Sequence, residues 1–228
     1  MLSTANGHNV LEATLHLPRT GVWQADLVVD TQNPSDVTGA IALSLIDGGL
    51  TLSGTSFRPP WLWRGVTRVR MLAGAGGMST PMTAQGYSNA PASVIVGDIL
   101  SGAGETLSGA SMSLAARMPS WARLGQSTDS QETAGSALQA IVDELGATWR
   151  SLPDGTVWIG TETWPASPLT DYQVIDAQPE DARIELVAAG PTLLPGTTFT
   201  GTTFTGGNVG RVVYRVRPDS FRVEVFFD

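Results

Sequence analysis

The sequence contains no cysteine and no lysine, and its only histidines are His8 and His16. Without cysteine, disulfide bonds and thiolate chemistry are both excluded. The sequence has no HExxH motif and no Cys/His cluster, so a zinc site is not expected. No GxSxG motif marks a nucleophile, and no glycine-rich segment has the GxGxxG or GK[ST] pattern of a phosphate-binding loop. We therefore predict no metal, no cofactor and no enzymatic activity.

Charged residues and long apolar runs are also scarce. Asp, Glu and Arg make up 15% of the 228 residues, compared with about 25% in an average globular protein. The net charge of −8 argues against stable binding to the phosphates of nucleic acid. No stretch reaches the ~20 consecutive apolar residues of a membrane span, and the N-terminus lacks the pattern of a secretory signal. The chain can bury a substantial core, and its 26 glycines and 14 prolines are typical of a turn-rich β protein.

Residues 133–165 predict one helix followed by one hairpin. Apolar residues recur at three- and four-residue spacing, as on the buried side of a helix; they are Leu138, Ile141, Val142 and Leu145. Thr133 or Ser130 can cap its start, and Gly146 can take the left-handed position at its end. Pro153-Asp154-Gly155 then predicts a turn between two short strands. We expect Leu138, Ile141, Leu145, Val157 and Ile159 to share one small core.

Alternating polar and apolar residues predict β-strands on both sides of this unit. The expected N-terminal strands are 9–17, 21–30, 36–45, 49–55 and 61–71, with a turn at Asp47-Gly48-Gly49. The expected C-terminal strands are 172–176, 182–189, 211–217 and 221–227. In the strand expected at 61–71, Trp61 and Trp63 would lie on one face and Arg64, Arg68 and Arg70 on the other.

Three segments give weaker patterns. Residues 73–90 are rich in glycine and small residues and are the best prediction of a loop or linker. Residues 91–100 fit a short helix that starts at Pro91, but their β-branched residues fit a strand almost as well, and 107–124 give no clear prediction. The pentapeptide TTFTG occurs twice, at 197–201 and 202–206, and we expect an extended loop or edge segment there.

Few residues are candidates for chemistry. Asp143 and Glu144 are neighbours on the predicted helix and therefore point in different directions. Glu162 lies beside Trp158 and Trp164 in the one carboxylate–tryptophan grouping that resembles a sugar site. The pair Trp61 and Trp63 fits either a sugar-stacking platform or packing in a core or subunit interface, and packing is favoured.

Three segments together resemble a known family. They are SALQAIVDELGATWRSLPDGTVWIGTETW (136–164), PGTTFTG (195–201) and RVVYRVRPDSFRVEVFF (211–227). The first resembles the small inserted domain of phage tail and baseplate hub proteins, a family that includes the tube-like hub module of type VI secretion spike proteins. The other two resemble the strand that re-enters the barrel and the final hairpin of such hubs.

The resemblance implies a mainly β fold with a small α+β insertion and two barrel-like β lobes of the tail-hub or tube type. The expected divisions are an N-terminal β lobe in 1–90, a middle region in 91–171 that contains the insertion at 133–165, and strands in 172–228 that complete the second lobe. Many hubs are longer than this chain and continue into a spike or lysozyme domain. The resemblance therefore implies a minimal hub with a separate spike.

The resemblance also implies a structural role in the virion, after assembly in the host cytoplasm. Hubs of this family form homotrimers whose six β-barrels make a ring that adapts a sixfold tail tube to a threefold tip, around a channel for DNA. The implied partners are the tail tube protein, other baseplate or tail-tip proteins and the spike, with transient passage of DNA and no stable nucleic-acid binding. Two alternatives remain open: a β module that binds or cleaves glycans through its tryptophans, and an ordinary tail-tube or tail-completion subunit.

The arginine rows give a prediction about the ring. A trimer would carry three times −8, and a channel lined by carboxylates would let DNA slide, whereas arginines would hold its phosphates. We expect a net acidic lumen, with the arginines outside it in contact with neighbouring subunits or partners; solvation of both rows remains the alternative. The candidate interface residues are Arg64, Arg68, Arg70, Arg211, Arg215, Arg217, Trp61 and Trp63.

Overall fold

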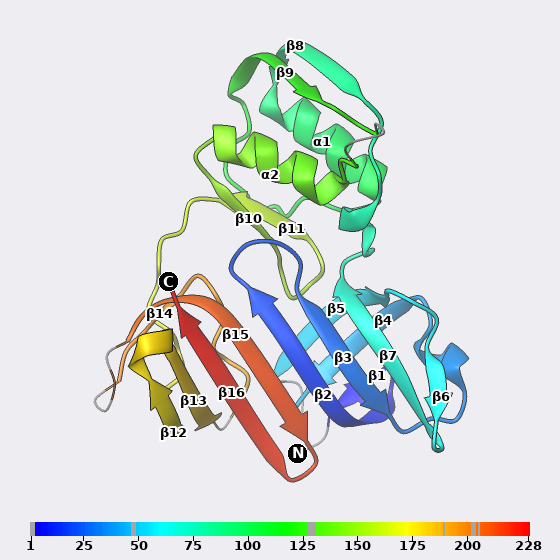
Figure 1. Cartoon of the computed structure of the whole chain (residues 1–228), viewed down its shortest axis with the longest axis vertical. Coiled ribbons are helices and arrows are strands. Elements are labelled where there is room, and N and C mark those ends of the chain that lie inside the picture. Colours follow the sequence, from blue (N-terminus) through cyan, green and yellow to red (C-terminus); the bar gives the residue numbers. More distant parts are fainter. Residues whose placement is uncertain (1–2, 47–48, 127–130, 189, 202–203, 205) are drawn as a thin grey trace.

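The computed structural model describes residues 3–46, 49–126, 131–188, 190–201, 204 and 206–228. It is mainly antiparallel β-sheet, below a smaller module of helices and short strands (Figure 1). The turn expected at residues 47–49, the alternative cap Ser130 and part of the TTFTG repeat lie wholly or partly outside the described residues.

The N-terminal strands pair in a partial ring. Their order is β4-β5-β7-β3-β2, and the two-residue strand β1 pairs with both β4 and β2. Inward-facing residues of these strands are apolar and buried, as the alternation predicts, so they enclose a core. The strands are β1 (Thr4–Ala5), β2 (His8–Pro18), β3 (Gln24–Val29), β4 (Ala40–Leu45), β5 (Leu50–Ser56), β6 (Trp61–Trp63) and β7 (Val66–Ala73), with the 3₁₀ turn η1 (Pro34–Val37).

The C-terminal strands form an open sheet that continues from the N-terminal one. β2 pairs with β15, and the order then runs β15-β16-β13-β12, while β14 pairs with β15 at Thr198 and Phe199. These elements are β12 (Tyr172–Gln178), the 3₁₀ turn η3 (Pro179–Asp181), β13 (Arg183–Ala188), β14 (Thr198–Phe199), β15 (Gly207–Arg217) and β16 (Ser220–Phe227). The mainly β class is confirmed. The prediction of two barrel-like lobes is only partly met. The structure has one large sheet, and its strands form only part of a ring.

Both sets of strands share one hydrophobic core. It includes Trp23, Leu43, Tyr214 and Val223, which are almost completely buried. Within this core the Tyr214 hydroxyl donates a hydrogen bond to the carbonyl of Leu193, which is also buried. The core is therefore continuous across the β2–β15 junction.

The alkaline limit of folding should depend on Tyr214. Burial raises the pKa of the Tyr214 hydroxyl, so only its neutral form suits the folded chain. Stability from this group should be fully present below about pH 10, the ordinary tyrosine pKa, and should fall as the pH rises further. Urea unfolding from pH 8 to 11 should show a shallower alkaline decline for Tyr214→Phe, together with a loss of about 1–3 kcal/mol at pH 8 because the Leu193 carbonyl loses its donor. Equal alkaline slopes for the two proteins would contradict this.

The module comprises residues 77–160 and has its own core. Leu138, Ile141, Val142, Val157 and Ile159 are completely buried in it, while Leu145 is partly buried against it. Its elements are the 3₁₀ turn η2 (Gly77–Ser79), β8 (Gln85–Pro91), α1 (Ala92–Ala103), β9 (Arg117–Arg123), α2 (Ala134–Glu144), β10 (Thr148–Ser151) and β11 (Val157–Gly160). The predicted helix and hairpin are thus confirmed, but they share their core with a second helix, α1.

The signals at the ends of α2 act as expected. The Thr133 hydroxyl accepts a hydrogen bond from the Ser136 amide, and the Ser136 hydroxyl accepts one from the Thr133 amide. This capping box satisfies two amides that have no partner within the helix. Gly146 follows the helix with φ = +63°, a conformation that glycine adopts without steric cost.

The ambiguous segments resolve as one helix and one strand pair. Residues 92–103 form α1, with Pro91 just before its start, because Ile95, Val96, Ile99 and Leu100 bury one side of the helix. The segment 73–90 is not simply a loop, since all of β8 except Pro91 lies within it and β8 pairs with β9. That pairing joins residues about thirty positions apart, so local composition gives no indication of it.

Candidate functional site: a charged sheet face, its two edges and the module junction

One face of the sheet is open to solvent across eight strands. Their order is β12-β13-β16-β15-β2-β3-β7-β6, and we call this surface the eight-strand face. It is turned toward the viewer in Figure 1, with β12 and β6 at its two ends. Cross-strand pairing places one row of outward side chains across six of these strands: Val187, Arg222, Arg215, Thr14, Asp26 and Arg70.

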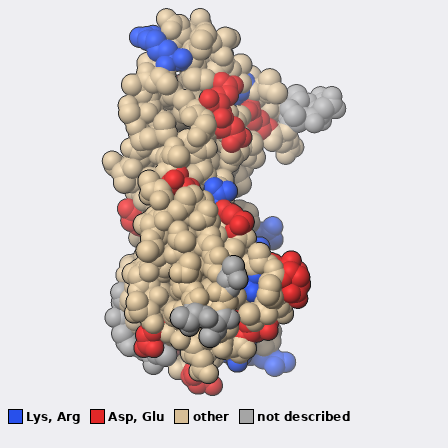
Figure 2. Space-filling view, turned by 90° about the vertical axis from the view of Figure 1, so that its left-hand side faces the viewer, with Lys and Arg blue, Asp and Glu red and all other residues tan. Residues whose placement is uncertain are grey.

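Five arginines on this face are paired with carboxylates, whereas Arg68 and Arg211 belong to no ion pair among the described residues. Arg70 makes two hydrogen bonds to Asp26, of 2.7 and 3.1 Å, and the Asp26 carboxylate raises the pKa of Arg70. In Figure 2 this face is seen edge-on at the right-hand margin, where both positively and negatively charged residues appear. The other pairs are Arg217–Glu12 (3.0 Å), Arg215–Glu224 (2.9 Å), Arg222–Glu185 (2.8 Å) and Arg183–Glu224 (3.4 Å). The face therefore carries five arginines in ion pairs and two, Arg68 and Arg211, that lie against aromatic rings.

The strand predicted at 61–71 is wrong: the structure has a hairpin there. Arg64 and Gly65 both have positive φ and form a two-residue turn between β6 and β7. The turn places Trp61 directly opposite Arg68, so the tryptophans share a face with Arg68 and not the opposite one. The guanidinium carbons of Arg64 and Arg68 lie 4.7 and 4.3 Å from the centre of the Trp63 ring, within the range of cation–π attraction.

The two ends of the face expose apolar side chains. Trp61 and Trp63 on β6 are 51% and 43% exposed, and Leu62 between them is 51% exposed. At the other end, Ile175 on β12 and Val187 on β13 are 45% and 42% exposed. The tryptophans therefore do not fill a core, which was one of the alternatives for them.

A cavity of about 520 Å³ lies at the junction between the module and the sheet. Its lining comes from both sides, with Trp158, Arg150 and Met112 from the module and Leu17, Trp23 and Leu194 from the sheet region. Glu162 also lines it, and its carboxylate is held by Arg150, whose guanidinium carbon lies 4.2 Å from the centre of the Trp158 ring. The carboxylate of the grouping that resembled a sugar site is therefore held in an ion pair beside the Trp158 ring.

The module rests on the sheet through its hairpin. The Trp23 indole donates a hydrogen bond to the Leu152 carbonyl (2.9 Å), and the Ser53 amide donates one to the Pro153 carbonyl (2.8 Å). Gly21 and Ser151 add a further backbone bond of 2.9 Å. The turn at 153–155 is thus part of the junction.

Gly155→Ala should weaken this junction. Gly155 has φ = +86°, and a Cβ there would lie 2.8 Å from the Ser53 carbonyl oxygen. We expect a loss of about 1–3 kcal/mol from backbone strain and displacement of the turn, measured by urea unfolding. Gly109→Ala is the matched control, since a Cβ at Gly109 meets nothing within 4 Å. Equal stability of the two variants would show that the turn is not held against β5.

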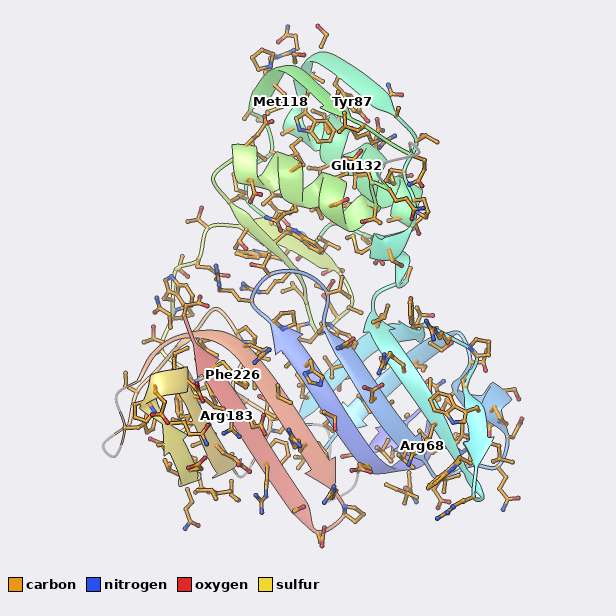
Figure 3. The ribbon with its side chains drawn as sticks, in the orientation of Figure 1. Arg68, Tyr87, Met118, Glu132, Arg183 and Phe226 are labelled. Atoms are coloured by element: carbon orange, nitrogen blue, oxygen red, sulfur yellow. The ribbon has the colours of Figure 1, made fainter. Side chains whose placement is uncertain are left out.

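The structure brings together most of the residues predicted from the sequence. Arg68, Arg70, Arg215 and Arg217 lie on the eight-strand face, and Arg211 lies there with its guanidinium carbon 3.8 Å from the centre of the Phe226 ring. Figure 3 shows Arg68 at one end of the sheet and Arg183 and Phe226 toward the other. Sequence reasoning missed the acidic partners and Arg183.

Within the described residues, no three His, Asp or Glu side chains gather as a metal site, and none of the helices there is long and apolar enough to span a membrane.

No protein-family model matches the sequence, and a search of curated proteins found no match to it. Solved structures, however, resemble the fold over almost the whole chain. The 43 kDa tail protein of prophage MuSo2 from Shewanella oneidensis has a TM-score of 0.64 at 8% identity, and the alignment covers 98% of this chain and 96% of that one. A tail protein from Neisseria meningitidis has a TM-score of 0.61 at 10% identity, covering 98% and 95%.

A third structure is the Escherichia coli c3393 protein, a component of the type VI secretion system described as similar to the bacteriophage T4 tail proteins gp27 and gp5. Its TM-score is 0.68 at 14% identity, and the alignment covers 99% of this chain and 74% of that one. Likeness at such identities establishes the fold and not the function. The resemblance predicted from the sequence is confirmed at that level: this chain has the fold of phage tail proteins and of their type VI secretion relatives.

Proposed function

We propose that the chain is a structural subunit of a phage tail-tip hub, in which three copies form a ring that joins the tail tube to the tip around the DNA channel. The observation that carries this proposal is the composition of the eight-strand face. Four of its strands come from the N-terminal part (β2, β3, β7, β6) and four from the C-terminal part (β12, β13, β16, β15). Each copy thus presents two four-stranded blocks side by side.

Two blocks per copy would let the ring match both the sixfold symmetry of a tail tube and the threefold symmetry of a tip. Three copies would present six similar blocks in a ring, so one end could contact a sixfold tube while the subunits keep threefold symmetry. The β2–β15 pairing and the shared core hold the two blocks of each copy in a fixed relation. The fold of phage tail proteins supports a location in the virion tail, with the tail tube protein and the tip proteins as partners.

Passage of DNA requires that the ring not hold phosphates. On the eight-strand face, Arg70, Arg215 and Arg217 are each paired with a carboxylate of the same chain. A paired arginine adds little net positive charge, so these three residues should contribute little to DNA binding, and Arg68 and Arg211 are left as the arginines of this face without a carboxylate partner among the described residues. The acidic lumen with both arginine rows outside it remains a prediction, and either row lining the channel of an assembled tail would contradict it.

Sedimentation and glycan binding separate this proposal from the alternatives. A trimer of about 72 kDa, three times the 23.9 kDa chain, that does not bind or cleave peptidoglycan fragments is the expected result. A hexamer would favour the tail-tube subunit. A monomer that binds the fragments would favour the glycan module, and hydrolysis abolished by Glu162→Gln would assign that module an enzymatic role.

A further inference from the structure

We propose that copies join head to tail through the two ends of the eight-strand face, with β6 of one copy pairing with β12 of the next. Arg58 and Arg64 would then face Glu180 and Asp171 across the interface. This inference rests on the proposed ring and names the surfaces that close it. The partner of each edge is a second copy of this chain.

Both edges have unused backbone hydrogen-bonding capacity. In the described residues, β6 pairs only with β7 and β12 pairs only with β13. No turn or loop backbone bond described for the chain involves either strand. Unpaired edges of this kind readily add another strand, so each is available to a neighbour.

Strand direction favours this pairing. Every neighbouring pair across the eight-strand face is antiparallel. Eight alternating strands leave β6 and β12 pointing in opposite directions. A copy related by rotation about the ring axis would therefore set its β12 antiparallel to β6, and the alternation would continue from copy to copy.

Exposed apolar residues are concentrated at the same two ends. Ten large apolar side chains are exposed in the described residues, and six of them lie at these edges. They are Phe57, Trp61, Leu62 and Trp63 at one end, and Ile175 and Val187 at the other. Register pairing places Trp61, Trp63 and Val187 on the same face of the sheet. Val187 lies one strand in from the β12 edge, opposite Gln173, so in an edge pairing the tryptophan rings would extend across β12 toward it.

The charges at the two ends are complementary. Exposed Arg58 and Arg64 flank β6, and neither belongs to an ion pair found in the described residues. Exposed Asp171 and Glu180 flank β12 and are likewise outside those ion pairs. In an antiparallel pair, the start of β6 meets the end of β12, which brings Arg58 toward Glu180 and Arg64 toward Asp171. Opposite charges at both ends would fix direction and exclude wrong partners.

The position of the edges makes the contact intermolecular. β6 and β12 lie on opposite sides of the sheet region (Figure 1), so they cannot meet within one chain. A contact between two different surfaces is head-to-tail, and it closes into a ring when the rotation permits.

Charge reversal tests the interface. R58E/R64E and D171R/E180R should each weaken self-association about a hundredfold or more, because like charges then face each other. The four substitutions combined in one chain restore opposite charges and should restore the wild-type oligomer in sedimentation. R117E/E144R, two exposed positions in the module, is the matched control and should assemble like the wild type. Thermal melts confirm that each variant is folded.

Mixing the two charge-reversed proteins adds a sharper criterion. Every contact in a mixture is favourable only when the two variants alternate, and alternation cannot close a ring of three. The mixture should therefore give dimers or even-numbered species, whereas the fourfold variant gives trimers.

Cross-linking provides a readout independent of charge. Because the chain has no cysteine, L62C/I175C treated with a short bis-maleimide should give covalent dimers and trimers, and equal amounts of L62C and I175C should give dimers only. A trimeric wild type whose charge-reversed variants stay trimeric and whose L62C/I175C does not cross-link would overturn the edge pairing and leave the ring intact. A monomeric wild type would instead overturn the proposed ring, and the edge pairing with it.

Discussion

Ile141→Ala should lower the free energy of unfolding by about 2–5 kcal/mol. Ile141 is completely buried on α2, where it packs in the module core with Leu138 and Val157. Removal of its side chain leaves a cavity that the neighbouring helix α1 and hairpin can only partly fill. Urea unfolding followed by tryptophan fluorescence measures the loss, since the module core contains Trp121 and Trp149.

Asp143→Asn is the matched control on the same helix. Asp143 is exposed and accepts a hydrogen bond from the Gln139 side chain (2.6 Å), so its replacement should change stability by less than about 0.5 kcal/mol. If Asp143→Asn lowered the free energy of unfolding more than Ile141→Ala does, α2 would bury the side that carries Asp143 and not the side that carries Ile141.

Arg150→Ala should be as damaging as a large core substitution. Its side chain is 18% exposed and pairs with Glu162, which is 8% exposed. Removal of the arginine leaves a buried carboxylate without a counter-charge, at a cost of about 3–5 kcal/mol. It also removes the cation from the Trp158 ring and opens the junction cavity.

A second variant distinguishes the lost ion pair from lost packing. Arg150→Met/Glu162→Leu removes both charges while retaining similar volume, and it should recover most of the stability lost in Arg150→Ala. A double variant as unstable as the single one would contradict the role assigned to the unpaired carboxylate.

The sequence predicted elements whose signals are local. The three- and four-residue spacing of Leu138, Ile141 and Val142, with Thr133 and Gly146 at the ends, defined α2 because each signal acts within a few residues. The Arg64-Gly65 turn was missed, since such turns usually carry Asn-Gly or Asp-Gly and the surrounding alternation continues through it. Tertiary packing, not local preference, decided between helix and strand for residues 91–100.

The candidate site depends on contacts that no local pattern specifies. Arg217 and Glu12 are 205 positions apart, and only the β2–β15 pairing makes them neighbours. Alternation predicted that Arg211, Arg215 and Arg217 share a face, but not that carboxylates from other strands accompany two of them. The sequence pattern does not specify which residues of distant strands lie opposite each other, and this long-range register decides which carboxylates meet the arginines.

Electron microscopy of the purified 228-residue chain tests the central claim most directly. Particle averages should show a ring of three copies with six β lobes around an open centre. A closed ring of six copies would contradict the hub proposal in favour of a tube subunit, and isolated single copies at every protein concentration would contradict ring formation altogether.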